Sequence, residues 1–391
     1  MNEIEKLIQE LCPDGVEYRR LGEVCVLQRG KVISKDYIRD NQGIYPVYSS
    51  QTANNGILGY INSFMFDGDY LTWTTDGAYA GTVFRRKGKF NITNVCGLIN
   101  SKDDFVNQDF LYFWLSFTAK NYVSEGMGNP KLMSNVLSTI PIPLPPIPIQ
   151  EKIVEILDKF TSLEEQLEAE LEARRKQYEY YREKLLTFSP DDKNVRWVTL
   201  GKICDTLSGF PFDSSKFKEE GVQLMRGANV KRGYFDFSQE INKYWDSSDG
   251  LEKYLLAPND IIISMDGSLV GRSFSYIKEE HLPLLLVQRV ARLRTKENYK
   301  YIYFCISKSF PDYVDKKKTA GAIPHISLKD INSFPIPLPP LSEQRRIVAI
   351  LDRFEALTND LQAGLPAELM ARRQQYEYYR EKLLTFKRKT V

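Results

Sequence analysis

The chain has 391 residues, of which 42% are apolar and 27% are charged, and its formal net charge is +2. This length is too great for one compact core and predicts two or three domains. The small net charge is not that of a strongly basic nucleic-acid-binding protein, but a local basic patch is sufficient for phosphate contacts. No apolar run approaches the roughly 20 residues that span a bilayer, and the acidic first residues do not resemble a signal peptide.

The cysteines indicate the compartment. There are five, dispersed along the chain and without a CxxC pair: Cys12, Cys25, Cys96, Cys204 and Cys305. An odd, dispersed set disfavours both a disulfide framework and a zinc site, and it suits a reducing cytosol. We therefore expect a cytoplasmic protein without a metal site.

The first segment matches the end of a helical repeat found later in the chain. Residues 5–8 (EKLI), followed by Pro13-Asp14, resemble residues 183–186 (EKLL), followed by Pro190-Asp191. We predict a short helix at the N-terminus, then a globular region, a helix, a second globular region and a second helix. This order suggests a circular arrangement, in which the N-terminal piece docks near the end of the last helix.

The strongest signal is an internal duplication, the mark of a repeat architecture. Residues 141–160 read PIPLPPIPIQEKIVEILDKF and residues 335–354 read PIPLPPLSEQRRIVAILDRF. Further on, 174–188 reads RRKQYEYYREKLLTF and 372–386 reads RRQQYEYYREKLLTF. The offset between copies is 194 for the first pair and 198 for the second. The second copy therefore holds four extra residues between these two anchors.

The globular regions, about 13–140 and 190–334, are only faintly alike. The pattern V-x-Y-x-x-L-G-x-V-C at 16–25 matches V-x-W-x-x-L-G-x-I-C at 195–204, and Asp76-Gly77…Gly81…Phe84 matches Asp266-Gly267…Gly271…Phe274. Short β-type runs, YLTWTT, GTVFRR, DIIISM and RVARLR, alternate with Gly- and Asn-rich turns, and helical stretches are predicted near 107–120 and 297–309. Both regions are predicted to be mixed α/β.

A long helix follows each proline-rich strip. In the first copy apolar residues from Ile153 to Leu185 recur at spacings of three and four, which is a heptad seam. Residues 151–188 would extend about 57 Å. We expect Pro148 in the first turn of this helix, and Ser342 as N-cap of the second with Glu343 in its first turn.

A helix with one apolar seam needs a partner, which the second copy supplies. Acidic residues 164–172 precede the basic residues 174–176, so an antiparallel partner would set acidic halves against basic halves. The second helix has the basic end, but its first half is mixed, so the charge argument is only partly supported. Pro366 and the four extra residues predict that this helix is bent or broken near 361–366, because an interior proline kinks a helix.

The combination of strip and helix resembles a known family. Two I/F-P-I-P-L-P-P strips, at 140–146 and 334–340, are each followed by a Q-x-x-I-V-x-I-L-D helix, and two dissimilar domains open with L-G-x-V/I. Over nearly its full length the chain resembles the specificity subunit of type I restriction-modification systems. The resemblance implies a non-catalytic subunit, in which each globular domain reads one half of a bipartite target in double-stranded DNA.

The resemblance also implies partners and a fold class. Two modification (methyltransferase) subunits would dock on the helices, which also set the spacer, and restriction subunits would join the complex. The partners would carry S-adenosylmethionine, ATP and Mg²⁺, and this chain no cofactor. The fold is α+β: two mixed α/β target-recognition domains separated by two long antiparallel helices that form a coiled coil, with a pseudo-two-fold internal repeat. The predicted segments are 1–146, 147–188, 189–340 and 341–391.

DNA recognition needs cations for phosphates and side chains that read base edges, arginine or lysine for guanine and asparagine or glutamine for adenine. In the second domain such residues lie on turn-rich loops: Arg226, Asn229, Lys231, Arg232, Arg272, Lys316, Lys317 and His325. In the first domain the corresponding candidates are Tyr48, Gln51, Asn54, Asn55, Tyr79, Arg85, Arg86, Lys87 and Lys131. Each basic residue could equally be a solvated surface residue and His325 could equally be structural, while Asn54-Asn55-Gly56 favours a plain turn.

Several enzyme motifs are missing. The sequence holds no GxxxxGK[ST] phosphate loop and no N/D-P-P-Y/F tetrapeptide of amino-methyltransferases, and Gly126-Met127-Gly128 lacks the third glycine of GxGxxG. His281 and His325 are too far apart in sequence to suggest a metal site. Two alternatives stay open: a structural coiled-coil adaptor that binds only proteins, and an enzyme with an unrecognised site.

Overall fold

The computed structural model describes residues 2–102, 104–124, 128–318, 324–359 and 363–389. The chain forms two compact units, the first made of residues 1–169 and 368–391 and the second of residues 170–367. No helix in the described ranges is long and apolar enough to cross a membrane. The same ranges hold no group of three or more His, Cys, Asp or Glu residues placed to bind a metal ion.

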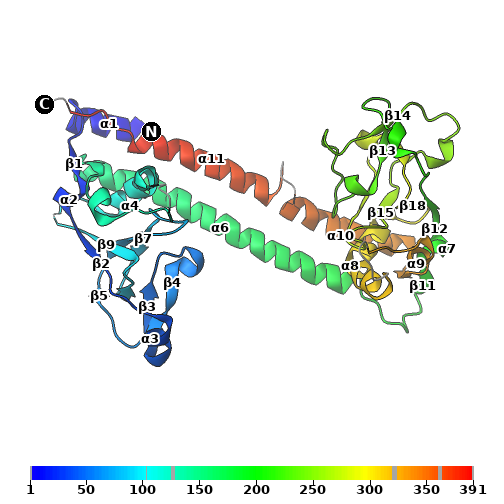
Figure 1. Ribbon diagram of the computed structural model, residues 1–391, viewed down its shortest axis with the longest axis horizontal. Helices are drawn as coiled ribbons and strands as arrows, with labels where there is room; N and C mark the ends of the chain where they lie inside the picture. The colour runs from blue at the N-terminus through cyan, green and yellow to red at the C-terminus, as the bar shows by residue number, and fades with distance from the viewer. Residues whose placement is uncertain (1, 103, 125–127, 319–323, 360–362, 390–391) are drawn as a thin grey trace. The chain divides into compact units, whose positions relative to one another are not determined.

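Figure 1 shows the helices along the chain. Up to the first proline strip they are α1 (Asn2–Leu11), α2 (Leu21–Val24), α3 (Lys35–Asp40), α4 (Gln108–Thr118) and α5 (Ser134–Leu137). The long helix α6 (Ile147–Leu185) follows and passes from the first unit into the second. The remaining helices are α7 (Leu200–Ile203), α8 (Tyr299–Lys317), α9 (Leu328–Asn332), α10 (Leu341–Asn359) and α11 (Leu365–Leu384).

Among the described residues, the strands of the first unit form two four-stranded sheets and one two-stranded sheet. One sheet has the order β2 (Cys25–Arg29), β9 (Cys96–Ser101), β6 (Tyr70–Thr74) and β7 (Val83–Arg86). Another has the order β4 (Ile57–Ile61), β3 (Gln42–Tyr48), β8 (Lys89–Ile92) and β5 (Phe66–Asp67). The proline strip itself forms β10 (Pro141–Pro143), which pairs with β1 (Tyr18–Arg20).

The second unit repeats this plan. Its main sheet has the order β12 (Cys204–Ser208), β18 (Val290–Thr295), β15 (Ile261–Ser264) and β16 (Phe274–Tyr276). A three-stranded sheet joins β14 (Tyr244–Trp245), β13 (Val222–Met225) and β17 (Leu284–Leu286), and β11 (Arg196–Thr199) pairs with β19 (Pro335–Leu338). The duplication seen in the helices therefore extends to the sheets, and the four predicted β-type runs and both predicted helical stretches are confirmed.

The register of the main sheets corrects one match made from the sequence. Val83 lies opposite Trp73 in the first unit, and Phe274 lies opposite Ile263 in the second. The position equivalent to Phe274 is therefore Val83 and not Phe84. The sequence match failed by one residue because the turn before β16 holds one more residue than the turn before β7, and glycine spacing alone does not show this.

Each main sheet packs on its own helix to form a core. In the first unit Trp73 on β6 packs with Phe110 and Phe113 of α4, and all three are almost fully buried. In the second unit Ile263 on β15 belongs to the same kind of cluster as Tyr301 and Phe304 of α8. Burial of apolar area is the main stabilising contribution in both cores. In both units the core holds the sheet and helix as a rigid frame, from which the loops project.

The predicted docking of the N-terminal piece is confirmed within the first unit. Ile4 of α1 is buried in the same cluster as Leu383 and Leu384 of α11. The backbone N–H of Val16 donates to the carbonyl of Lys387 over 2.8 Å. The segments near the two ends of the chain therefore lie side by side (Figure 1), and both belong to the first unit.

The helices run antiparallel within each unit. In the first unit Phe160 of α6 stacks on Tyr379 of α11 at 5.5 Å, while Glu164 of α6 accepts from Arg373, which precedes Tyr379. In the second unit Tyr181 of α6 stacks on Phe354 of α10 at 5.5 Å. Arg373 also binds Glu168, so the predicted pairing of acidic and basic halves is present in the first unit.

The predicted interruption of the second helix is present, but its mechanism differs. Residues 360–362 lie outside the described residues; α10 ends at Asn359 before them, and α11 begins at Leu365 after them. Pro366 stands in the first turn of α11, where a missing N–H costs nothing, so it begins a helix and does not kink one. Ser342 lies inside α10, which begins at Leu341, so its assignment as N-cap was wrong.

Candidate nucleic-acid interface

Two loops meet at the same place in each unit. In the first, the N–H of Gly77 donates to the carbonyl of Pro130 over 3.0 Å. In the second, the N–H of Gly267 donates to the carbonyl of Pro324 over 3.1 Å. Both glycines adopt a positive φ, +92° and +104°, which glycine tolerates without steric cost. The Asp-Gly turn and the loop before the proline strip therefore form one pairing that is built twice.

A third loop joins this pairing in both units. The N–H of Thr75 donates to the carbonyl of Val95 over 3.1 Å, and that of Met265 donates to the carbonyl of Arg289 over 2.9 Å. Val95 and Arg289 are thus equivalent positions, each in the turn that precedes the second strand of the main sheet. We call the three loops the loop ring: residues 76–77, 94–95 and 130–132 in the first unit, and residues 266–267, 288–289 and 324–326 in the second.

The loop ring of the second unit carries a compact polar cluster. The carboxylate of Asp266 accepts from Arg289 Nη1 over 2.7 Å through one oxygen and contacts Nδ1 of His325 through the other. A cavity of about 410 Å³ is lined by Ser208, Met265, Asp266, Gln288, Arg289 and His325. A second cavity, of about 450 Å³, adds Arg226, Gly227 and Ala228 to part of this set. Polar side chains of several kinds, among them Gln288 and Arg289, therefore line two cavities that share part of their walls.

The loop ring of the first unit has the same backbone with other side chains. Lys131 takes the place of His325, with its Nζ 3.8 Å from Asp76. Asn94 takes the place of Gln288 and is exposed, and its carbonyl accepts from Arg29 Nε over 3.0 Å. Tyr79, at the tip of the Asp-Gly turn, is 57% exposed. A shared frame that presents different polar groups is what two different DNA half-sites require.

Other predicted residues of the first unit lie in an internal cluster. Arg86 is 2% exposed; its guanidinium stacks on the ring of Tyr48 at 3.6 Å and donates to Asn55 Oδ1 over 3.1 Å. Burial lowers the pKa of Arg86. Asn54 and Asn55 are exposed and adopt a positive φ in a turn, and Gln51 donates to the carbonyl of Ile57 over 2.5 Å. The turn interpretation of this segment is confirmed.

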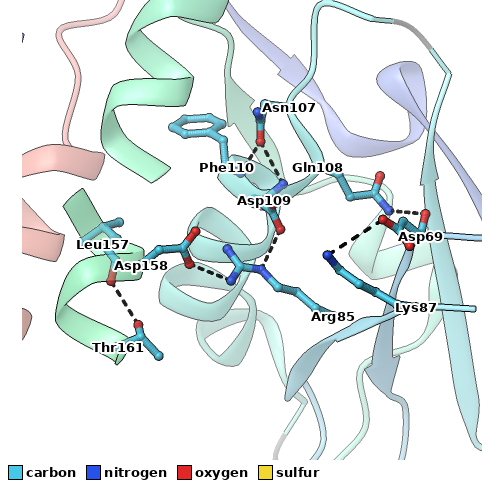
Figure 2. A network of polar contacts seen from close by, with 10 residues as sticks. All are labelled: Asp69, Arg85, Lys87, Asn107, Gln108, Asp109, Phe110, Leu157, Asp158 and Thr161. Carbon is cyan, nitrogen blue, oxygen red and sulfur yellow. Dashed lines mark hydrogen bonds and ion pairs between the residues drawn. The ribbon is translucent and has the colours of Figure 1, made fainter. Parts of the chain in front are cut away.

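Arg85 connects three elements of the first unit. Figure 2 shows its guanidinium between Asp109 of α4 and Asp158 of α6, each 2.7 Å away. It also lies over the rings of Tyr112 and Phe113. The side chain therefore fastens β7 to both helices. Lys87, the residue after the end of β7, has a side chain that is 75% exposed and lies 3.9 Å from Asp69.

The loop around Arg226 in the second unit is held by Asn229. This asparagine is fully buried, and its amide oxygen accepts from the N–H of Arg226 over 3.1 Å while its nitrogen donates to the carbonyl of Asp236 over 2.9 Å. The pattern is that of a turn-forming side chain, whose donors and acceptor are used internally. Arg226 itself donates to the carbonyl of Ile241, and Lys231 lies 3.8 Å from Asp236.

The other basic residues predicted to contact DNA in the second unit lie apart from the loop ring. Arg272 makes a two-pronged ion pair with Asp315, at 3.2 and 2.6 Å, and this pairing raises the pKa of Arg272 and lowers the pKa of Asp315. Arg272 and the exposed Arg232 both line a cavity of about 750 Å³ beside α8. Lys316 and Lys317 are exposed at the end of α8.

The structure thus brings some predicted residues together and adds others. Lys131 belongs to one loop ring and His325 to the other, while Tyr79 follows the Asp-Gly turn of the first ring and Arg226 borders the second. The structure adds Gln288 and Arg289, which the sequence did not suggest, and Asp266, which the sequence placed in a repeated turn but not among the candidates for DNA contact. A signal for Gln288 and Arg289 existed: in the run LPLLLVQRVA, these two polar residues interrupt an apolar stretch, and such an interruption predicts a turn with exposed side chains. DNA binding by any of these residues remains a prediction.

Comparisons with known proteins agree on a family. The family model described as "Type I restriction modification DNA specificity domain" matches residues 13–173 and again 192–371. The chain is 33% identical over 418 residues to the EcoR124I/EcoR124II specificity subunit of Escherichia coli, covering 99% of this chain and 97% of that protein. It is 30% identical over 370 residues to a type I specificity subunit of Mycoplasma pneumoniae, covering 93% of this chain and 96% of that one.

Solved structures share the fold. The S subunit of a type I restriction-modification system from M. genitalium aligns with a TM-score of 0.59 at 18% identity, covering 95% of this chain and 96% of that one. The HsdS subunit from Thermoanaerobacter tengcongensis aligns with a TM-score of 0.51 at 20% identity, covering 95% and 96%. The family model matches the chain twice, and two relatives match it over more than nine tenths of its length. The chain therefore belongs to the family of type I restriction-modification DNA specificity subunits.

Proposed function

We propose that this chain reads a two-part DNA sequence, with each unit reading one half through its loop ring. The observation that carries this proposal is the pair of loop rings. Their backbone hydrogen bonds are the same in both units, while their polar side chains differ: Asn94 and Lys131 in the first, Gln288, Arg289 and His325 in the second. A shared frame places each ring at a comparable depth in a groove, and the different side chains give each ring a different sequence preference.

The test is a map of methylated adenines in DNA modified by this chain together with its methyltransferase partner, against a control that lacks this chain. A gapped, two-part motif that depends on the chain is the expected result. If the partner is active and bound and no chain-dependent motif appears, the DNA-reading role fails, and the chain is better described as an adaptor that binds only proteins.

The helices are proposed to dock two copies of one partner. Tyr181 and Tyr379 are equivalent in the duplication, and each stacks on a phenylalanine of the opposite helix. Packing therefore explains why both copies have a tyrosine at this position. Tyr180 and Tyr378 are also equivalent, yet each is 60% exposed, so packing within the chain does not explain the tyrosines there. Exposed aromatic residues at matching positions are typical of binding surfaces, and two identical surfaces suit two identical subunits.

The partners proposed for these surfaces are methyltransferase subunits, which bring S-adenosylmethionine. ATP and Mg²⁺ would serve the restriction subunits that join them. Tyr180→Ala and Tyr378→Ala are each expected to remove one methyltransferase subunit from the complex, and the double variant both, as measured by native mass spectrometry. Tyr60→Ala, at a tyrosine that is 45% exposed in the first unit, is the control and should leave both subunits bound.

A further inference from the structure

Arg289 is held at two points. Its carbonyl accepts the N–H of Met265 over 2.9 Å, and its Nη1 donates to Asp266 over 2.7 Å. The side chain is nevertheless 64% exposed. Within the residues that the structure describes, its Nε and Nη2 have no hydrogen-bond or ion-pair partner. One edge of the guanidinium is therefore fixed by the protein, and the other edge, with two parallel donors, faces outward.

The backbone of Arg289 is unusual. Its φ is +66°, and the other non-glycine residues with a positive φ in the described ranges are all asparagines, Asn54, Asn55 and Asn259. Asparagine and glycine adopt this conformation at little cost, whereas a long side chain does so with strain. Strained residues that persist in a fold gather at functional sites. The turn would form more easily with another residue, so folding alone does not account for an arginine here.

The negative charge of Asp266 determines which ligands suit the outward edge of the Arg289 guanidinium. Its side chain is only 17% exposed, and it contacts His325 as well as Arg289. A carboxylate beside the guanidinium offsets the positive charge and repels a phosphate, so the pair is poorly suited to the DNA backbone. Guanine presents two neutral acceptors, N7 and O6, in the major groove, and these match the two parallel donors of an arginine edge.

We propose that Arg289 reads a guanine in the half-site of the second unit and that Asp266 is its positioning residue; this inference rests on the function proposed above. Because both the backbone and one edge of the guanidinium are held, little side-chain freedom is lost on binding. At the equivalent position the first unit has Val95, whose side chain has no hydrogen-bond donor. The first unit therefore reads its own half-site without this contact.

The test compares adenine-methylation maps made with the wild-type chain and with Arg289→Ala, each with the methyltransferase partner. One guanine position in one half of the motif should become degenerate, with discrimination against the other bases falling roughly 5- to 150-fold. The other half should not change. Arg289→Lys should keep part of the discrimination, because an ammonium lacks the paired donors. Lys202→Ala, an exposed lysine on α7, is the control and should leave the motif intact.

The outcomes separate the two proposals. If the wild-type chain gives no chain-dependent motif, the DNA-reading function fails. If the wild type gives a motif and Arg289→Ala reproduces it unchanged, the guanine assignment is overturned. If Arg289→Ala lowers methylation equally at all sites without changing the motif, Arg289 contacts phosphate, and the assignment is overturned as well.

The positioning role of Asp266 has its own readout. Asp266→Asn keeps the size and one acceptor but removes the charge, so it should relax the same guanine position to a smaller degree than Arg289→Ala. Asp266→Ala should relax it as fully as Arg289→Ala, and adding Asp266→Ala to Arg289→Ala should bring no further change at that position. A motif that changes at a different position, or an unchanged motif in Asp266→Ala, overturns the positioning role.

Discussion

Strand β7 of the first unit and strand β16 of the second have the same place in matching sheets, yet their charges differ. By register Arg85 is equivalent to Tyr276, and Arg86 to Ile277, the residue after β16. Ile277 is fully buried, as Arg86 nearly is. Tyr276 packs on Tyr303 at 5.1 Å, where Arg85 lies over Tyr112. Strand β7 therefore builds arginines into its interior contacts, where strand β16 and the residue after it use apolar and aromatic side chains.

The second unit has no arginine at this place on the strand, and a lysine on the neighbouring short helix supplies the positive charge. In the second unit Lys300 of α8 binds Asp352 of α10 at 2.7 Å. Lys300 and Asp109 both stand two residues after the helix N-cap, and Asp352 and Asp158 are equivalent in the repeat. The carboxylate on the long helix is thus neutralised in both units, from the strand in one and from the short helix in the other. A duplicated fold keeps the electrostatic balance while exchanging the residues that supply it.

The largest expected effect tests the buried arginine. Arg86→Ala removes the stacking on Tyr48 and leaves the partners Thr72 and Asn55 without a donor, so it should lower the free energy of unfolding of the first unit by about 2–4 kcal/mol. Hydrogen exchange should show faster exchange across 70–92 and none of the effect across 261–277. Lys87→Ala, at a mostly exposed side chain, should change stability by less than about 0.5 kcal/mol. Equal effects of both variants would contradict the burial argument.

A smaller effect is expected from converting one unit to the arrangement of the other. Asp109→Lys places a lysine beside Arg85 and removes one of its carboxylates, which should cost about 1–2 kcal/mol, since these groups are partly exposed. Adding Arg85→Tyr recreates the tyrosine, lysine and aspartate of the second unit and should recover at least half of that loss. A double-mutant cycle measured by chemical unfolding checks this. Additive losses would show that the two arrangements are not interchangeable.

The smallest effect concerns the helices. Arg373 binds Glu164 and Glu168, and its side chain is 49% exposed. Its counterpart in the repeat, Arg175, has no ion pair within the described residues. Arg373→Ala should therefore lower stability by about 0.5 kcal/mol, and Arg175→Ala by less. Thermal unfolding in low and high salt distinguishes them, because only the Arg373 effect should shrink as salt screens the pairs. An Arg373 effect that does not depend on salt would point to lost packing.

Features that depend on neighbours along the chain were predictable. The heptad seam, the strands that begin at Tyr70 and Ile261, and the docking of the first helix all followed from periodicity and from the internal repeat. These patterns record which face of each element is buried, and burial dominates the choice of fold. Family membership followed for the same reason, since the proline strip and the helix after it are continuous segments.

The state of each charged side chain was decided only by the tertiary structure. Arg86 and Lys87 are adjacent in the sequence, yet one is buried and the other exposed, because Tyr48 of β3 and Asn55 of the turn after it lie against Arg86. The side chain of Arg289 is held by Asp266, which lies 23 residues earlier in the chain. Whether a cation is used internally or left free depends on which partners the fold brings within a few ångströms, since electrostatic and hydrogen-bond energies fall off over that range. Sequence periodicity carries no record of those distances.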